Sequence, residues 1–300
     1  MSNRIEFSSC IVCGATSFTD ELVVTDWLVS NEDFLVKECN ACSFRFTSNP
    51  PAAEHAGPYY ETEEYVEHSD NAEGLINVVY HKARTWMLKY KLRLIRKHSD
   101  GKRLLDLGSG SGYFLNSMKN NGYDVNGVEI SDKAVALCQN KFRIKAYSPT
   151  EFLANEIPGE FDVATMWHVF EHVYSYNEYF DMLHKKLTKN GTLIIAMPNY
   201  YCLEEKTYKK YWNGYDTPRH IWHFTPSTFP RFAKDRGFEM VKMTSLPLDM
   251  FYNSMISASY KKSFTFLPIT VFVGLCSLML SIFSFKRTSS VVYVMKKVEL

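Results

Sequence analysis

In the stretch Leu104-Leu-Asp106-Leu-Gly108-Ser-Gly110-Ser-Gly112-Tyr-Phe114, a short apolar strand runs into a glycine-rich turn and then into a helix. Glycines let the backbone turn tightly and come close to a ligand, and the free N–H groups at a helix start attract polar groups. The spacing is G-x-G-x-G, whereas the dinucleotide-binding pattern G-x-G-x-x-G needs a glycine where Tyr113 stands. Because Asp106 ends the strand, the turn would repel a pyrophosphate and favour a cationic ligand.

A second acidic residue ends the next predicted strand, in Asn126-Gly-Val-Glu129. A carboxylate at this position can accept hydrogen bonds from both hydroxyls of a ribose. Together with Asp106, Glu129 predicts a site for a nucleoside whose tail is positively charged and carries no phosphate.

From Lys102 onward, short apolar segments alternate with helical segments. This alternation predicts βαβ units and a mostly parallel sheet covered by helices on both faces. A long helix is predicted at Leu75–His98, which has no glycine, proline or acidic residue. The predicted strands are Arg103–Leu107, Val125–Ile130, Arg143–Ala146, Phe161–Trp167, Thr192–Met197, Glu239–Thr244 and Val291–Lys296, and the helices between them include Tyr113–Asn120, Asp132–Asn140, Asn177–Leu187 and Ser227–Arg236.

Four blocks resemble class I S-adenosylmethionine-dependent methyltransferases in sequence, order and spacing: LLDLGSGSGYF, NGVEIS, FDVATMWHVFEHV and KNGTLIIAMPN. The resemblance covers about residues 80–245. It implies a Rossmann-like α/β fold with a seven-stranded sheet, in which the last strand lies antiparallel beside the fifth. It also implies S-adenosylmethionine as the cofactor, bound by Asp106, Gly108, Ser109, Gly110, Gly112, Glu129, Ile130, Glu151, Trp167 and His168.

Two segments rich in histidine follow the fourth and fifth predicted strands, where α/β sheets place their ligands. The candidate catalytic residues in them are His168, Glu171, His172, His220 and His223. On a helical turn, the first three of these would share one face.

Three interpretations of the histidines remain open. They are structural residues of the crevice wall; or one is the general base that takes a proton from an acceptor hydroxyl; or His168, Glu171 and His172 bind a divalent metal with a histidine of the later segment. The stretches WHVFEHV and PRHIWHFTPSTF resemble ubiquinone-type O-methyltransferases and glycan-cluster methyltransferases. This resemblance suggests oxygen as the acceptor atom.

The N-terminal region contains two C-x-x-C pairs, Cys10/Cys13 and Cys39/Cys42. Paired knuckles of this kind supply the four thiolates of a structural Zn²⁺ site, although a redox role is the alternative. Residues 1–50 contain three Arg/Lys against seven Asp/Glu, which argues against contact with nucleic acid. The neighbouring Tyr59, Tyr60 and Tyr65 would either close over the cofactor or pack against the sheet domain.

The segment Phe264–Phe285 has no charged residue, and Lys261-Lys262 and Lys286-Arg287 flank it. It is long enough to span a bilayer. However, the strand predicted at Val291–Met295 returns to the sheet, so both ends lie on one side and a single crossing is excluded. Two alternatives remain: peripheral membrane contact by a re-entrant or in-plane helical pair, and a buried helix or dimer interface.

The sequence thus predicts a zinc ribbon at 1–50, a linker with N-terminal helices at 51–100, and a methyltransferase domain at 101–300 with a hydrophobic insertion at 264–285. The first ten residues have no basic run followed by an apolar run, so we expect no secretory signal, and the net charge is +1. We expect a cytoplasmic enzyme, or one that is peripheral on the inner face of the membrane. It would methylate a hydroxyl oxygen of a small-molecule or lipid-linked acceptor and would bind no nucleic acid. The alternative from another class is a non-catalytic cofactor-binding scaffold, and the sequence does not predict an oligomeric state.

Overall fold

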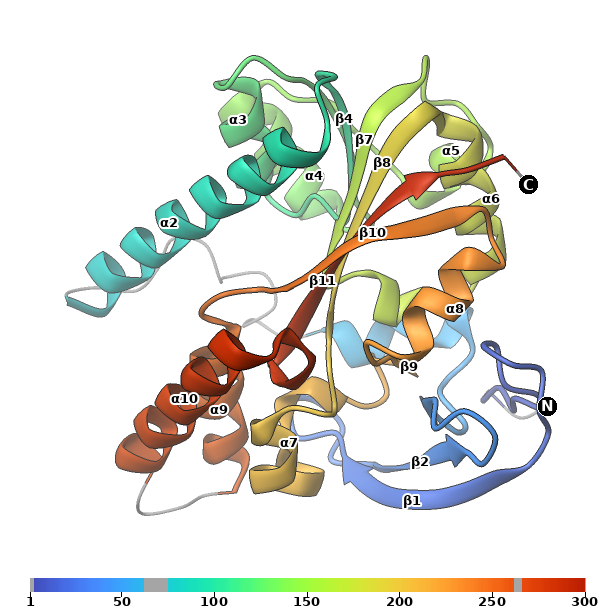
Figure 1. The fold of residues 1–300 in the computed structure, drawn as a ribbon, viewed down its shortest axis with the longest axis vertical. Helices are drawn as coiled ribbons and strands as arrows, with labels where there is room; N and C mark the ends of the chain where they lie inside the picture. The colour runs from blue at the N-terminus through green and yellow to red at the C-terminus, as the bar shows by residue number, and fades with distance from the viewer. Residues whose placement is uncertain (1–2, 62–74, 262–265, 300) are drawn as a thin grey trace.

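The computed structural model describes residues 3–61, 75–261 and 266–299, and its centre is a seven-stranded sheet of order β10-β11-β8-β7-β4-β5-β6 (Figure 1). Strands β4 to β8 pair in parallel, and β11 runs antiparallel to both of its neighbours. The predicted fold is therefore confirmed, including the last strand beside the fifth. The strands are β4 (Arg103–Leu107), β5 (Asp124–Val128), β6 (Ala146–Tyr147), β7 (Phe161–Trp167), β8 (Leu187–Pro198), β10 (Phe238–Ser245) and β11 (Ser290–Lys297).

Three strands differ from the prediction by more than one residue, and one of them, β8, begins at Leu187 rather than at Thr192. Strand β5 ends at Val128, because the Glu129 carboxylate accepts hydrogen bonds from the N–H groups of the two residues after it and so turns the chain. The third strand is Ala146–Tyr147 rather than Arg143–Ala146. Here Arg143 adopts a left-handed conformation, with φ of 55°, and ends the preceding helix.

Helices cover both faces of the sheet (Figure 1). Successive strand residues alternate between the faces, so that Leu104 packs beneath one helical layer and Leu105 beneath the other. One layer contains α2 (Leu75–His98), α3 (Tyr113–Lys119) and α4 (Asp132–Phe142), and the other contains α5 (Pro149–Leu153), α6 (Tyr176–Lys186) and α8 (Thr228–Lys234).

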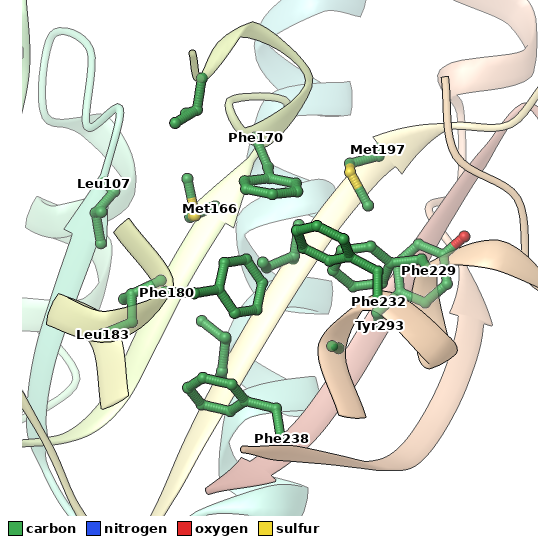
Figure 2. Close-up of a cluster of buried hydrophobic side chains, with 14 of the residues drawn as sticks. Leu107, Met166, Phe170, Phe180, Leu183, Met197, Phe229, Phe232, Phe238 and Tyr293 are labelled. Carbon is green, nitrogen blue, oxygen red and sulfur yellow. The ribbon is translucent and has the colours of Figure 1, made fainter. Parts of the chain in front are cut away.

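The second layer is held to the sheet by a cluster of aromatic rings (Figure 2). Phe180 meets Phe232 edge to face with ring centroids 5.2 Å apart, and Phe229 lies 4.5 Å from Tyr293 of β11. Phe170, on the loop after β7, packs into the same cluster. Because such rings bury large areas in specific geometries, this cluster fixes the start of the loop that carries the first histidine segment.

A second, antiparallel sheet contains β1 (Phe18–Thr25), β2 (Asp33–Cys39), β3 (Arg45–Thr47) and β9 (Trp222–His223). Its fourth strand comes from the later histidine segment, with Phe46 paired to Trp222. The N-terminal cysteine region is thus joined by backbone pairing to the segment that follows β8.

Between β10 and β11 the chain forms two packed helices, α9 (Asp249–Tyr260) and α10 (Phe266–Phe283), which also contact α7 (Leu203–Tyr208) (Figure 1). The first two residues of the predicted insertion lie outside the described residues. In the described part of the chain, no helix combines the length and the apolar character needed to cross a membrane. Short 3₁₀ turns complete the fold: η1 (Ala53–His55), η2 (Gly57–Tyr60), η3 (Phe170–His172), η4 (Lys209–Tyr211), η5 (Asn213–Tyr215) and η6 (Phe285–Arg287).

Candidate active site

The glycine loop between β4 and α3 is held against the end of β5. The N–H groups of Gly108 and Ser109 both donate to the carbonyl oxygen of Val128, at 2.7 and 3.0 Å. A Cβ at Gly108 would lie only 2.2 Å from Val169 Cγ2. The loop therefore packs directly on the segment that carries the first histidines, and only glycine fits at this contact.

The middle of the loop is open. Gly110 has φ of 52°, and no described atom lies within 4 Å of the position that its Cβ would take. Its N–H donates to Glu129 Oε2 at 2.7 Å, while Glu129 Oε1 accepts from the N–H groups of Ile130 and Ser131. The side chain of Ile130 is 82% exposed. An open glycine beside an exposed apolar side chain suits a ligand that needs both close backbone approach and a flat apolar surface.

Asp106, at the end of β4, is buried and accepts a hydrogen bond from Thr165 Oγ1 at 2.5 Å. Burial raises the pKa of Asp106 to about 7, against the opposing effect of that hydrogen bond and of Lys91. The Lys91 ammonium, on α2, lies 4.2 Å from the centre of the Trp167 ring, and burial lowers its pKa to about 8. A buried carboxylate favours a positively charged ligand group, and the Lys91 ammonium would compete with such a group for Asp106.

Two buried polar atoms of this region, Ser109 Oγ and Trp167 Nε1, have no hydrogen-bond partner among the described residues. Buried polar atoms normally have partners, so these atoms are suited to a bound ligand. We call Asp106, Gly108 to Gly112, Glu129, Ile130 and Trp167 the glycine-loop side of the site. The residues present fit the predicted cofactor. Glu151 instead forms a capping box with Ser148 at the start of α5, and its cofactor contact stays a prediction.

The first histidine of the other half, His168, is an imidazolium held between two carboxylates. Its Nε2 lies 2.8 Å from Asp249 Oδ2 and its Nδ1 lies 3.3 Å from Glu171 Oε1. Although burial acts in the opposite direction, Asp249 and then Glu171 raise the pKa of His168 to about 10. With both nitrogens protonated, His168 cannot accept a proton at neutral pH.

His172 has the opposite character. Its Nδ1 lies 3.1 Å from the carbonyl oxygen of Arg219 and 3.2 Å from the hydroxyl of Tyr60, and its ring is 4.6 Å from that of His220. Burial and the neighbouring His220 lower the pKa of His172 to about 4. Since the Nδ1 proton is donated to a carbonyl, the lone pair of the neutral imidazole lies on Nε2.

His220 approaches the same point from the later segment. Its Nδ1 donates to the carbonyl oxygen of Gly214 at 2.9 Å, and the backbone N–H of Ile221 donates to the Glu171 carbonyl at 2.8 Å. One ligand atom from each of Glu171, His172 and His220 lies within 4.8 Å of the other two, so these three could hold a metal ion. We call His168, Glu171, His172 and His220 the histidine side of the site.

His223 is placed elsewhere. It lies in β9, where its Nε2 is 3.2 Å from Thr47 Oγ1 and its ring faces Tyr215. Burial lowers the pKa of His223 well below that of a free histidine. His223 therefore lies in the second sheet and does not join the histidine side.

Two residues that contact the histidine side are far from it in the sequence. Asp249 is 81 residues from its partner His168, and Tyr60 is 112 residues from His172. Tyr65, predicted beside Tyr60, lies outside the described residues. Arg219 forms buried ion pairs with Asp216 and with Asp26 of the N-terminal region, at 2.6 and 2.9 Å. The spacing Asp216-x-x-Arg219 within the second histidine segment is a sequence signal that could have pointed to this network.

The four predicted zinc ligands converge. Sγ of Cys10 lies 3.6 Å from that of Cys42, and Sγ of Cys13 lies 3.5 Å from that of Cys39. All four sulfur atoms lie within 4.8 Å of one another. Tetrahedral zinc with Zn–S bonds of about 2.3 Å would separate its sulfurs by about 3.8 Å, so the cluster fits this metal.

A sequence model of the family described as Methyltransferase domain matches residues 79–243, more than half of the chain. The chain belongs to the class I S-adenosylmethionine-dependent methyltransferases. The matched residues form the catalytic domain of this family, whose methyl donor is S-adenosylmethionine. The alternative of a non-catalytic scaffold is therefore set aside.

Curated proteins are similar to this chain over part of its length. The ubiquinone biosynthesis O-methyltransferase of Bordetella bronchiseptica is 36% identical over 80 residues, which are 24% of this chain and 33% of that protein. The protein of the same name from Psychrobacter cryohalolentis is 31% identical over 107 residues, 33% of this chain and 42% of that protein. The matches thus cover less than half the length of these curated relatives.

Among solved structures, magnesium protoporphyrin IX methyltransferase from Synechocystis PCC 6803 with bound SAH is similar to this chain with a TM-score of 0.50. The sequence identity is 13%, and the match covers 77% of this chain and 90% of that one. This likeness shows a shared fold.

Proposed function

We propose that this methyltransferase transfers the methyl group to a hydroxyl oxygen of a small or lipid-linked acceptor, with His172 as the general base. The observation that carries the proposal is the state of His172: a neutral imidazole whose Nδ1 is bound to the Arg219 carbonyl, which leaves the lone pair on Nε2. The name of the similar curated proteins, ubiquinone biosynthesis O-methyltransferase, also supports oxygen as the acceptor atom.

His168 takes a positioning role in this proposal. Its contact with Glu171 Oε1 fixes the carboxylate, and its contact with Asp249 fixes its own ring. Glu171 is 1% exposed, and its charge lies beside the ring of His172. An anion there stabilises the imidazolium that forms when His172 accepts a proton.

When bound, S-adenosylmethionine supplies a methyl group on a positively charged sulfur. As the acceptor oxygen forms its bond to this carbon and the carbon–sulfur bond breaks, the hydroxyl proton passes to Nε2 of His172. General base catalysis of this kind contributes about 10²–10⁴-fold to a rate. The rest of the acceleration comes from the alignment of acceptor and methyl group by the two sides of the site.

A second way to activate the hydroxyl is a divalent metal held by Glu171, His172 and His220. The observation in its favour is Glu171 Oε2, which is buried and has no hydrogen-bond partner among the described residues. Both histidines donate Nδ1–H to a backbone carbonyl, as metal-binding histidines often do. Metal analysis of the purified enzyme separates the two mechanisms. About one transition metal per chain beyond zinc at the cysteines, lost in Glu171→Gln, supports the metal, and its absence supports the base.

We also propose that Cys10, Cys13, Cys39 and Cys42 bind a structural Zn²⁺. The sulfur distances support this proposal, and a segment of this size has little apolar core of its own, so the metal would supply much of its folding free energy.

The test of the base uses transfer of an isotope-labelled methyl group from S-adenosylmethionine into an extract of the source cell, with NMR of the product to identify the methylated atom. His172→Asn keeps a hydrogen-bond donor near the Nδ1 position but removes the base. His223→Gln keeps the contact with Thr47 and serves as the matched control. We expect a loss of about 10²–10⁴-fold in His172→Asn and less than about tenfold in His223→Gln. Equal losses in both variants, or a product methylated on nitrogen or carbon, would refute the proposal.

A further inference from the structure

The two helices inserted between β10 and β11 expose an unusual amount of apolar surface. Phe272 and Ile282 are each 69% exposed and Phe283 is 82% exposed. Ordinary surface helices turn such side chains toward the core. We define the apolar face of the hairpin as Tyr252, Met255, Val271, Phe272, Leu275, Leu278, Met279, Ile282 and Phe283, all of them exposed.

The buried side of α10 is made of small or polar residues. Thr270, Val273 and Ser277 are buried, and they recur every three or four residues, on one side of the helix. Gly274 lies against the ring of Phe251, where a Cβ would be 2.4 Å from Cδ1. Helix α10 thus has its small residues inside and its large apolar residues outside, the reverse of a helix in a water-soluble domain.

Helix α9 is built in the same way. Its buried residues include Asn253, Ser254 and Ser257, and they are satisfied by hydrogen bonds: Asn253 donates to Ser289 Oγ at 2.7 Å, and Tyr208 and Ser254 share a bond of 2.6 Å. Small and polar residues at helix contacts, with large apolar residues facing outward, are the pattern of helices that contact lipid.

After Asp249, the charged residues of the hairpin have one sign. Between Asp249 and Glu299 the sequence contains no acidic residue. Exposed cations stand after both helices, Lys261 at the end of α9 and Lys286 and Arg287 beyond the end of α10. A second copy of the same surface would bring these cations together, whereas an anionic lipid surface complements them.

We propose that the apolar face of the hairpin docks on a bilayer that contains anionic lipids, with α10 lying in the plane of the interface. Helix α10 is 18 residues long, about 27 Å. Ser245, at the end of β10, pairs with Val291, at the start of β11, so the hairpin leaves and rejoins the sheet at one place. This connection allows the hairpin to lie on a membrane and return, as monotopic helices do.

Docking would bring the membrane to the active site. Asp249, the first residue of α9, is the residue that binds His168. The hairpin therefore begins at the histidine side. This step rests on the proposed function and narrows its acceptor to a membrane-borne molecule whose hydroxyl lies near the headgroups.

The test is flotation of the full chain with two kinds of vesicle, phosphatidylcholine alone and phosphatidylcholine with phosphatidylglycerol. We expect the wild type to float with the anionic vesicles at least about tenfold more than with the neutral ones. Phe272→Glu/Ile282→Glu changes exposed positions only and should lower binding at least about tenfold. The matched control is Leu137→Glu on α4, which is 44% exposed and lies outside the hairpin. It should bind within about twofold of wild type.

Absence of wild-type binding to either vesicle, or an equal loss in Leu137→Glu, would overturn the proposal. So would sedimentation that shows a dimer dissociated by Phe272→Glu/Ile282→Glu without vesicle binding, because a second copy would then cover the face. Vesicle binding is measured without acceptor or cofactor. Its failure would thus be distinct from failure of the O-methyl transfer that the His172 variants test.

Discussion

The glycine-loop side and the histidine side of the site are built in different ways. The first is built mainly from the ends of two adjacent strands. The backbone N–H groups of Gly108 and Ser109 donate to the Val128 carbonyl, and that of Gly110 donates to the Glu129 carboxylate. The second is gathered from Tyr60, the loop after β7, the segment after β8 and the start of α9. We therefore expect cofactor binding to depend on residues that are close in the sequence, and acceptor chemistry to depend on contacts between distant segments. The two should be separable by mutation.

The largest effect is expected from a cysteine substitution that impairs the histidine side and leaves the glycine-loop side intact. Cys39→Ser should remove zinc, and with it the second sheet and the Asp26 partner of Arg219. We expect methyl transfer to fall at least about 100-fold, because the histidine side loses its alignment. The affinity for S-adenosylmethionine, measured by calorimetry, should stay within about threefold.

Metal analysis and circular dichroism accompany these measurements. Cys276→Ser, on α10, is the matched control and should keep both zinc and activity. If Cys39→Ser lost cofactor binding as severely as methyl transfer, the two sides would not be separable.

The next effect concerns stability. Asp26 and Arg219 are an ion pair with side chains 0% and 1% exposed, so Asp26→Asn leaves a buried guanidinium with less compensation. We expect the free energy of unfolding to fall by about 3 kcal/mol in urea denaturation. Glu299→Gln is the matched control, since its pair with Lys189 is more than three-quarters exposed and should change stability by less than about 0.5 kcal/mol. Similar values for the two variants would contradict the structural role of this pair.

On the glycine-loop side, Asp106→Asn should weaken S-adenosylmethionine binding by about 2 kcal/mol, about 30-fold, at pH 8. The pKa of Asp106 is raised by burial to about 7, so the carboxyl is neutral below that pH and attracts a cation less. Burial lowers the pKa of Lys91 to about 8, so this competing cation loses its charge as the pH rises, which also favours binding of a cationic ligand. Wild-type affinity should therefore increase from pH 6 to pH 8.

Calorimetry across this range checks the pH dependence of binding. Asp106→Asn should show the smaller dependence, from Lys91 alone. An affinity that fell from pH 6 to pH 8 in the wild type would exclude Asp106 as the group that meets the cation.

The smallest effect is expected from two glycines that both have positive φ. Gly110 and Gly122 have φ of 52° and 83°, and at neither does a described atom lie within 4 Å of an added Cβ. Alanine at either should cost about 1 kcal/mol of stability from backbone strain. Only Gly110→Ala should weaken cofactor binding, by about tenfold, because only Gly110 lies in the loop that approaches the ligand. Equal affinities in the two variants would show that the cofactor stays away from Gly110.

The difference between the two sides also explains what the sequence could predict. Asp106, the glycines and Glu129 form contiguous motifs at strand ends, and their order along the chain implied the sheet. The convergence of His172 with His220 followed from the rule that strand carboxyl ends meet at one edge. The pairing of Asp249 with His168 and that of Tyr60 with His172 could not be predicted, because no periodicity links residues that are 81 and 112 positions apart.

The hairpin illustrates a second limit. The uncharged run Phe264–Phe285 predicted an apolar helix, but an apolar run does not tell which side faces the protein. The structure places Thr270, Gly274 and Ser277 inward, an arrangement set by packing on α7 and α9. Likewise, β9 has only two residues, too few for any alternation of apolar and polar positions to predict a strand.

That short strand has a consequence for how such enzymes can be recombined. Arg45 and Phe46 of β3 pair with His223 and Trp222 of β9, and Arg45 also binds the hydroxyl of Tyr215, 170 residues away. A chimaera that took only residues 1–50 from a relative would inherit half of a sheet and half of an ion-pair network. The smallest exchangeable part is therefore discontinuous: the cysteine region together with 200–224, which includes the Tyr200 and Glu205 partners of Arg45. We expect grafts of this pair of segments to fold where grafts of either one alone fail.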